Sequence, residues 1–377
     1  MAKRVLVAGG GIGGLAAGIA LQRAGFEVNI LERAARAGEV GSGILIQPNG
    51  ARALKTLGVP IIAAGGLTHL TLRTWRGRHL NEVPFSLFRE RHGFGVEVVA
   101  RSKLHSQLLE TLGTDRVTVG ADVDRFAEAD GRVTVALRDG RKIEADLLIG
   151  ADGLRSAVRA QLLGDGEPHY LGCTAWRAMT DISGTGLEGG QGLSWWGPGG
   201  EFGALPMQDL VYWFATANAA PGEAVPPGRR LKDLLDRFGD WQAPIPELIL
   251  RTEPSAILRN DVYDRPPVRS WTRGRVTLLG DAAHPMAPNA AQGACQALED
   301  AVALGAALTD EPDLEAGLLR YQLLRLRRAN EFVRLSRQTS AAIQSENRIL
   351  SAVRNLGARL MPAGLMLRQL DRTLSGT

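Results

Sequence analysis

Two carboxylates, each at the end of an apolar segment and each close to glycines, are the residues of this chain that most clearly suggest chemistry. Glu32 ends the apolar segment 27–31, and Asp281 ends the segment RVTLLGD at 275–281. A carboxylate at the carboxyl end of a buried strand can accept hydrogen bonds from sugar hydroxyls at the ligand-binding edge of an α/β sheet. The pair therefore predicts a ligand with ribose-like hydroxyls.

The elements around Glu32 follow the pattern of a dinucleotide-binding turn. Gly9, Gly11 and Gly14 stand in G-x-G-x-x-G register after a predicted strand and before a predicted helix. The first glycine allows a tight turn, the second lets a pyrophosphate approach the backbone, and the third lets helix and strand pack closely. Glutamate rather than arginine at position 32 favours FAD or NAD over NADP. The alternative is a glycine turn that serves packing alone.

Two further segments combine an apolar strand, a glycine-containing turn and the start of a helix. In KIEADLLIGADGLRSAVR, residues 142–159, Asp152 follows the strand and Arg159 is expected on the helix. In GDAAHPMAPNAAQGACQALEDA, residues 280–301, two prolines fix a loop before Gly293. The backbone N–H groups there would form a second helix N-terminus facing an anion or an electron-rich ring. A simple dehydrogenase has no evident use for these segments.

In this order, the three segments resemble the FAD-dependent aromatic hydroxylases of the para-hydroxybenzoate hydroxylase type, the single-component group A flavoprotein monooxygenases. The matching pieces are VAGGGIGGLAAGIAL…LER, GADGLRSAVR and GDAAHPMAPNAAQGACQALEDA, with weaker similarity in GEVGSGILIQPNGARALKTLG, VVARSKLHSQLL and YLGCTAWRAM. The resemblance implies FAD as cofactor and NADH or NADPH as electron donor. It also implies hydroxylation of an aromatic or conjugated small molecule with O2, through a C4a-hydroperoxyflavin.

The resemblance further implies which residues hold the cofactor. Glu32 would bind the adenosine ribose, Val123 the adenine through its backbone, and Arg101 the ribityl–phosphate portion. Asp281 would bind the ribityl and phosphate region, and Asp152 is associated in the family with both FAD and NAD(P)H. The expected FAD-binding residues are Gly9, Gly11, Ile12, Gly13, Gly14, Glu32, Arg33, Gly43, Arg101, Val123, Asp152, Asp281, Gly293 and Ala294.

The chain departs from the family pattern at two positions. Ala291-Gln292-Gly293 stands where the family usually has Gly-Gln-Gly, so the backbone near the flavin has less conformational freedom. Glu201 stands in a segment where an arginine is frequent. The acidic residue puts in doubt an arginine clamp for an anionic substrate.

Residues 169–269 contain alternating stretches such as LVYWFATANA, separated by Gly and Pro turns, which predicts an antiparallel sheet. Such a sheet would form a wall of the substrate pocket. The alternative is that its aromatic residues form the core of the sheet, and that the polar candidates support turns. No catalytic residue is identified, and Tyr212 is the best candidate for a substrate contact. The candidate pocket residues are Gln47, Asn49, Trp176, Trp195, Tyr212 and Pro288.

The predicted fold is α/β, with a Rossmann-like FAD-binding domain, an inserted antiparallel-sheet substrate domain and C-terminal helices. The expected FAD-binding domain is discontinuous and comprises residues 1–75, 97–168 and 270–312. The substrate domain comprises 76–96 and 169–269, and the helical segment comprises 313–377. The arginine-rich tail is expected to pack as a helical cap, and the alternative is an amphipathic surface for a membrane or a partner.

Composition excludes several classes of function. The net charge of +4 is modest, so no nucleic-acid partner is expected. Cys173 and Cys295 are the only cysteines and the six histidines have no metal spacing, so we expect neither disulfides nor a metal, and His284 is expected to support its loop. No stretch is apolar enough for a membrane span, so we expect a soluble, cytoplasmic protein. The expected oligomeric state is a monomer or a homodimer.

Three other kinds of function remain as alternatives. The first is another flavoprotein of the same fold, a reductase or a halogenase-like enzyme, although Trp195-Trp196-Gly197-Pro198 does not match the halogenase signature Trp-x-Trp-x-Ile-Pro. The second is an NAD-dependent dehydrogenase. The third, and least favoured, is a non-catalytic, membrane-associated binding protein that uses the basic tail.

Overall fold

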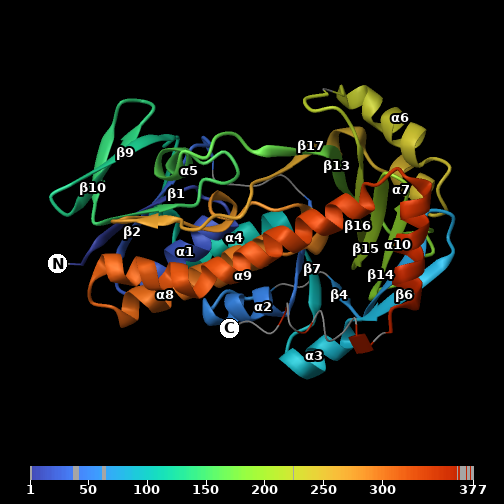
Figure 1. Ribbon diagram of the computed structural model, residues 1–377, viewed down its shortest axis with the longest axis horizontal. Coiled ribbons are helices and arrows are strands. Elements are labelled where there is room, and N and C mark those ends of the chain that lie inside the picture. Colours follow the sequence, from blue (N-terminus) through green and yellow to red (C-terminus); the bar gives the residue numbers. More distant parts are fainter. Residues whose placement is uncertain are drawn as a thin grey trace.

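The computed structural model describes residues 2–36, 42–61, 65–223, 225–362, 364–365, 371 and 374. Part of the family-like segment at 38–41 and the last residues of the C-terminal segment lie outside this set. Within it, two sheet-based layers lie at the two ends of the long helix α9 (Leu314–Ile343) (Figure 1). The first layer contains the N-terminal strands, and the N-terminus lies at its outer end, away from the second layer.

A six-stranded sheet brings the three sequence segments to one edge. Its order is β18-β19-β12-β1-β2-β8, and β1 is parallel to both β2 and β12, as β12 is to β19. Because the carboxyl ends of parallel strands meet at the same edge, the turns that follow β1, β2, β12 and β19 lie together there. The strands are β1 (Arg4–Ala8), β2 (Glu27–Glu32), β8 (Val117–Val119), β12 (Leu147–Gly150), β18 (Thr272–Arg273) and β19 (Val276–Leu278).

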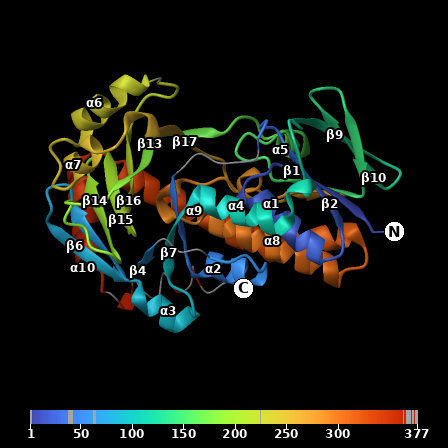
Figure 2. The ribbon, with the colours of Figure 1, turned by 180° about the vertical axis from the view of Figure 1, so that it is seen from behind.

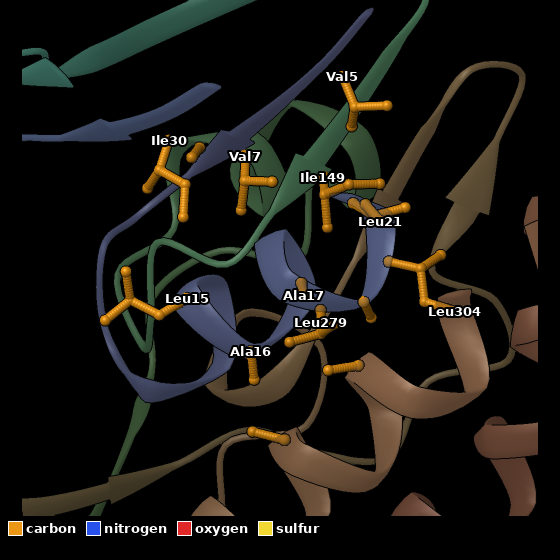
Figure 3. Close-up of a cluster of buried hydrophobic side chains, with 14 of the residues drawn as sticks. Val5, Val7, Leu15, Ala16, Ala17, Leu21, Ile30, Ile149, Leu279 and Leu304 are labelled. Carbon is orange, nitrogen blue, oxygen red and sulfur yellow. The ribbon is translucent and has the colours of Figure 1, made fainter. Parts of the chain in front are cut away.

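Small residues allow helices to approach this sheet and one another closely. A Cβ atom on Gly305 of α8 (Gly293–Asp310) would lie 2.9 Å from the Cβ of Ala20 on α1 (Ile12–Arg23). Figure 3 shows the resulting core, in which side chains such as Val7, Leu15 and Ile149 meet between the strands and helices. The helix α4 (Arg101–Leu112) packs against α1 from the other side.

Two small sheets and three short helices flank this core. The hairpin of β10 (Arg132–Leu137) and β11 (Lys142–Ala145) turns at Asp139-Gly140, and β9 (Val123–Ala129) completes its sheet. The second small sheet has β7 between β3 and β4. Its elements and the nearby helices are β3 (Gly43–Ile46), β4 (Gly65–Leu67), β7 (Val96–Ala100), α2 (Pro48–Thr56), α3 (Ser86–His92) and α5 (Ala157–Leu163).

The second layer is a seven-stranded sheet in the order β17-β13-β16-β15-β14-β5-β6. It is antiparallel except where β14 runs parallel to β5 (His69–Thr74). The division made from the sequence gave β5 to the FAD-binding part, but its ladder with β14 places it in this sheet; a strand's own pattern does not name its partner. The other strands are β6 (His79–Pro84), β13 (His169–Asp181), β14 (Gln191–Gly197), β15 (Gly200–Met207), β16 (Leu210–Asn218) and β17 (Leu258–Asp264).

Helices cover the seven-stranded sheet on one side and connect it to the first layer on the other. Both views show α6 (Pro227–Phe238) and α7 (Ile245–Leu250) on its outer side, away from α9 (Figures 1 and 2). The helix α9 packs along α8, whereas α10 (Arg348–Leu360) exposes the apolar side chains of Ile349, Val353 and Leu360. Throughout the described residues, no helix combines the length and apolar character needed to cross a membrane.

Candidate active site

The glycine turn after β1 has the geometry that a pyrophosphate site requires. Gly9 adopts a φ of +103°, and a Cβ there would lie 2.4 Å from the carbonyl oxygen of Ala151. A Cβ on Gly14 would lie 1.9 Å from the carbonyl oxygen of Gly9, so the helix touches the turn after β1 at this position. Beside Gly11, in contrast, no atom lies within 4 Å of the Cβ position. The helix α1 begins at Ile12 without a side-chain cap, which leaves its N–H groups available in this open space.

The carboxylate of Glu32 lies directly over this turn. Its oxygens accept hydrogen bonds from the backbone N–H groups of Gly10 and Ala34, both at 2.7 Å. Arg33 follows at the surface. Sequence reasoning missed the support beneath the turn: the buried His105 ring on α4 has its Nε2 atom 2.8 Å from the carbonyl oxygen of Gly10. No spacing rule links a histidine on α4 to a turn almost a hundred residues earlier.

The second motif forms a helix cap. One carboxylate oxygen of Asp152 accepts a hydrogen bond from the Ser156 hydroxyl at 2.5 Å, and the other accepts one from the backbone N–H of Ala157 at 2.8 Å. Burial raises the pKa of Asp152 above its ordinary value, although these donors oppose the shift. The observed contacts of Asp152 are therefore with α5, and its role toward FAD and NAD(P)H stays a prediction.

Arg159 on α5 connects the second motif to the third. Its buried guanidinium donates to the carbonyl oxygens of Ala282 and Ala283 at 2.9 and 2.7 Å, and it pairs with Asp165. These carbonyls belong to the last residue of the short helix η3 (Gly280–Ala282) and to the residue that follows it. The sequence placed Arg159 on this helix without giving it a function; the structure shows that it positions the loop carrying Asp281.

The carboxylate of Asp281 faces the N-terminus of α8. A Cβ atom on Gly293 would lie 3.8 Å from Asp281 Oδ1, its closest neighbour, and α8 begins at Gly293, as predicted, with no side-chain cap. Asp281 is exposed and Ala294 is partly exposed. Among the described residues no side chain pairs with this carboxylate, and its place beside the N–H groups of a helix N-terminus suits a ligand that carries both hydroxyls and a polar ring or anion.

A cluster of amide side chains holds the backbone that leads into α8. Gln47 Nε2 donates to the carbonyl oxygen of Ala290 at 3.1 Å, and its amide oxygen accepts from Gln292 Nε2 at 2.7 Å. Asn49 donates to Gln292 and to Glu299. Gln47 and Asn49 therefore support this loop, which was one of the two alternatives for them. Ala291 lies in the left-handed region with φ of +49°, where the family glycine would be unstrained.

Below this loop is a buried ionic cluster that sequence reasoning did not find. His284 Nε2 lies 2.5 Å from Asp300 Oδ2, and the other oxygen of Asp300 accepts from Arg325 Nε at 2.7 Å. Burial favours a raised pKa for Asp300, but His284 and Arg325 outweigh it and hold the pKa at about 2. All three side chains are at most 2% exposed. His284 therefore supports the loop, as expected.

The seven-stranded sheet separates the predicted aromatic pocket residues onto two faces. Trp176 pairs across its ladder with Ala215, whereas Tyr212 pairs with Met179, so the two aromatic rings point in opposite directions. Trp176 and Trp195 pack in the core between the sheet and α6, and Trp176 meets the Phe238 ring in a T-shaped arrangement. The expectation that they line the substrate site is corrected, because α6 and α7 cover their face.

Tyr212 lies on the opposite face, against the FAD-binding elements. A Cβ atom on Gly43 would lie 2.3 Å from Tyr212 Cγ, so the β3 backbone packs against the ring. Burial raises the pKa of Tyr212, and Arg177 and Arg101 oppose the shift. The structure therefore brings Gly43, Arg101 and Tyr212 together. Val123 is buried at the start of β9, beside the segment in which Ala121 donates to the Glu32 carbonyl.

The remaining candidates lie at the turn between the two layers. Pro288 is exposed and begins the short helix η4 (Pro288–Ala290), which faces the Tyr212 side of the sheet through Asn289. Across the described ranges, no group of three or more His, Cys, Asp or Glu side chains could hold a metal ion. The open space at Gly11, the free helix N-termini and the two carboxylates fit a large dinucleotide cofactor.

The FAD binding domain family matches residues 2–174 and 249–336, and the chain belongs to this family. It is a group A FAD-dependent monooxygenase, and the predicted fold class and cofactor are confirmed. Aurachin C monooxygenase/isomerase from Stigmatella aurantiaca is 44% identical over 377 residues, which is 99% of this chain and 98% of the relative. The FAD-dependent urate hydroxylase of Klebsiella pneumoniae is 33% identical over 341 residues, 89% of each chain.

Solved structures of FAD-bound proteins are also similar to this chain. The crystal structure of Klebsiella pneumoniae HpxO complexed with FAD and uric acid has a TM-score of 0.93 and 30% sequence identity to this chain. The match covers 99% of this chain and 97% of that chain. The crystal structure of an arginine-to-glutamine variant of HpxO complexed with FAD has a TM-score of 0.94 and 29% identity, and it covers 99% of this chain and 98% of that chain.

Proposed function

We propose that this enzyme hydroxylates an aromatic or conjugated small molecule with NADH or NADPH and O2. In the overall reaction, NAD(P)H, a proton, O2 and the substrate give NAD(P)+, water and a product with one added oxygen atom. The observation that carries the proposal is the similarity to aurachin C monooxygenase/isomerase along essentially the full length of both chains. Aurachin C is therefore the first substrate to test, and urate is the second.

Bound FAD would supply the chemistry, since it accepts a hydride from NAD(P)H and activates O2 for transfer of one oxygen atom. The chain would bind and orient it. In this proposal the N–H groups at Gly11 and Ile12 hold the pyrophosphate, Glu32 accepts from the adenosine ribose and Asp281 accepts from the ribityl chain. The Tyr212 face of the seven-stranded sheet forms the substrate wall. The two layers enclose the reacting atoms and exclude water.

In this proposal the two layers also have different functions. The FAD-binding part comprises the six-stranded sheet with its helices, and the substrate part comprises the seven-stranded sheet including β5. Support comes from the position of Gly43, Arg101 and Tyr212, where the two parts contact each other.

The test begins with the visible spectrum of the desalted protein, which should show flavin bands. Oxygen uptake and NAD(P)H oxidation are then measured with aurachin C, urate, and panels of phenolic acids, quinolones and polycyclic polyketides. We expect at least one compound to accelerate both rates together, and mass spectrometry with 18O2 should find one labelled atom in the product. NAD(P)H oxidation coupled to substrate reduction without oxygen uptake would identify a reductase instead. A protein that cannot be reconstituted with FAD would contradict the proposal altogether.

A further inference from the structure

A carboxyl group that the cofactor-binding elements do not use lies on the Tyr212 face of the seven-stranded sheet. Glu201 on β15 pairs across the ladder with Thr216, and Leu205 on the same strand pairs with Tyr212. Residues an even number of positions apart on a strand share a face, so Glu201, Thr216 and Tyr212 point to the same side. Glu201 is only 5% exposed.

The Glu201 carboxylate has few hydrogen-bond donors around it. Among the described residues it accepts one hydrogen bond, a long one of 3.4 Å from Asn289 Nδ2, and it forms no ion pair. Asn289 belongs to η4, the turn that leads into the N-terminus of α8. Glu201 therefore faces the loop that also carries the backbone proposed to contact the flavin.

Arg354, whose charge acts on Glu201, is held by other groups. The Arg354 guanidinium donates to the carbonyl oxygens of Gly197, Ala342 and Ile343, and it lies over the Trp196 ring at 5.5 Å. It contributes a favourable field at Glu201 without a hydrogen bond. The thiol of Cys173 on β13 also faces this carboxyl.

A buried hydrogen-bond acceptor that lacks a good donor in the protein can bind a donor group of a ligand. Leaving such a group unpaired costs free energy, and a ligand that supplies an N–H or O–H donor recovers it. A ligand that supplies a second carboxylate meets like-charge repulsion instead. Burial raises the pKa of Glu201 to about 7, with Asn289 and Arg354 opposing the shift, which is the response expected of a poorly paired carboxyl.

We propose that Glu201 is a substrate-binding residue, whose carboxylate accepts a hydrogen bond from an N–H or O–H group of a neutral aromatic substrate. The same residue disfavours substrates that place a carboxylate at this position. The inference rests on the proposed function, because it assumes that the Tyr212 face is the substrate wall. It narrows the substrate class to uncharged ring systems with a hydrogen-bond donor.

Three quinoline probes of similar size test the donor directly. They are 4-quinolone, which carries an N–H donor, 1-methyl-4-quinolone, in which that donor is removed, and quinoline-4-carboxylate, which is anionic. Binding to the oxidised holoenzyme is measured at pH 8 from the change in the flavin spectrum, so the test needs no turnover. We expect 4-quinolone to bind about tenfold more tightly than either other probe, because a hydrogen bond to a charged group contributes this much.

Substitutions then identify Glu201 as the origin of the preference. Glu201→Gln keeps the shape and should reduce the preference for 4-quinolone several-fold, whereas Glu201→Arg should make quinoline-4-carboxylate the tighter ligand. Glu346→Gln is the matched control, because Glu346 is an exposed carboxylate nearby that bonds to Asn218. FAD content and the melting temperature are recorded for each variant. Equal preferences in wild type and both Glu201 variants would overturn the proposal, as would failure of the wild type to bind 4-quinolone.

A pH series on the wild type gives a test that requires no variant. Between pH 6 and 8 the affinity for 4-quinolone should rise several-fold, since the carboxylate is a stronger acceptor than the acid, and the affinity for quinoline-4-carboxylate should fall. Arg354 stays charged over this range, and burial raises the pKa of Cys173 to about 11, so neither changes its charge. Parallel pH trends for the two probes would count against Glu201. Absence of oxygen uptake with any substrate would refute the proposed function without affecting these binding measurements.

Discussion

Replacement of Asp300 by asparagine tests whether the buried ionic cluster positions the cofactor loop. One oxygen of Asp300 accepts from Arg325 Nε, and the other faces His284 Nε2 and the backbone N–H of Gly280. Asparagine can offer its single oxygen to only one of these sides, so its amide group then points at a donor on the other side. The change also leaves Arg325 buried with Glu299 as its remaining acidic partner.

The expected magnitude follows from these losses. Breaking a buried ion pair by removing one partner costs about 3–5 kcal/mol, and Glu299 compensates part of the charge, so we expect a loss of about 3 kcal/mol in the free energy of unfolding. Asp310→Asn is the matched control on the same helix, because Asp310 is exposed and pairs with Arg320 at the surface. Such a pair is worth about 0–1 kcal/mol.

Two measurements on both variants decide the matter. Urea unfolding followed by circular dichroism gives the free energy, and flavin fluorescence gives the dissociation constant of FAD. Asp300→Asn should lower the free energy of unfolding. It should also raise the dissociation constant of FAD, since Gly280 and His284 lie on either side of Asp281 in the chain. If Asp300→Asn behaves like Asp310→Asn in both assays, the argument that this cluster positions the loop is refuted. Lower stability with unchanged FAD affinity would show that the cluster stabilises the fold but does not position the loop that carries Asp281.

Three further predictions concern the same elements. Ala291→Gly should raise the free energy of unfolding by roughly 0.5–1 kcal/mol, because it removes left-handed strain, whereas Ala290→Gly should not; thermal melting compares them. Gly43→Ala should destabilise by about 1–3 kcal/mol, since its methyl group would overlap the Tyr212 ring, and Gly228→Ala, with open space around it, should melt no earlier than the wild type. The pKa of Asp300 is held near 2, below its ordinary value of 3.8, so its stabilisation of about 2 kcal/mol should be complete above about pH 4 and lost as the pH falls toward 2. Asp300→Asn should lack this part of the acid transition, and an identical loss between pH 4 and pH 2 in wild type and variant would contradict the assignment.

The sequence predicted the turns between strand and helix at the carboxyl edge of the six-stranded sheet well because its signals are local. In the turn at Gly9, the strand, the glycines and the helix follow one another in a single stretch, so the pattern of the turn is visible in those residues. The same holds for Gly293, where the start of α8 is set by the glycine and prolines before it. Parallel strand order then brings the motifs together, which the fold class already implies.

The supports of the loop could not be predicted in this way. Gln47 contacts Ala290 and Gln292, which lie more than two hundred residues later in the chain, and Arg325 reaches Asp300 from another helix. Trp176 and Tyr212 illustrate a second limit. Period-two alternation shows that a strand has two faces, but not which face meets α6 and which meets the FAD-binding elements. That choice depends on Phe238 and Gly43, contacts that only the folded chain defines.

The buried polar groups around residues 280–293 explain how an irregular loop can hold a fixed shape. A loop without ladder hydrogen bonds leaves its carbonyl and N–H groups to be satisfied by side chains. Arg159 satisfies the carbonyls of Ala282 and Ala283, and Gln47 satisfies that of Ala290. Each donor is itself held by a partner on a different element. Because burying such charges gives little net stability, we infer that their contribution is to orient Asp281 and the N-terminus of α8 toward one ligand.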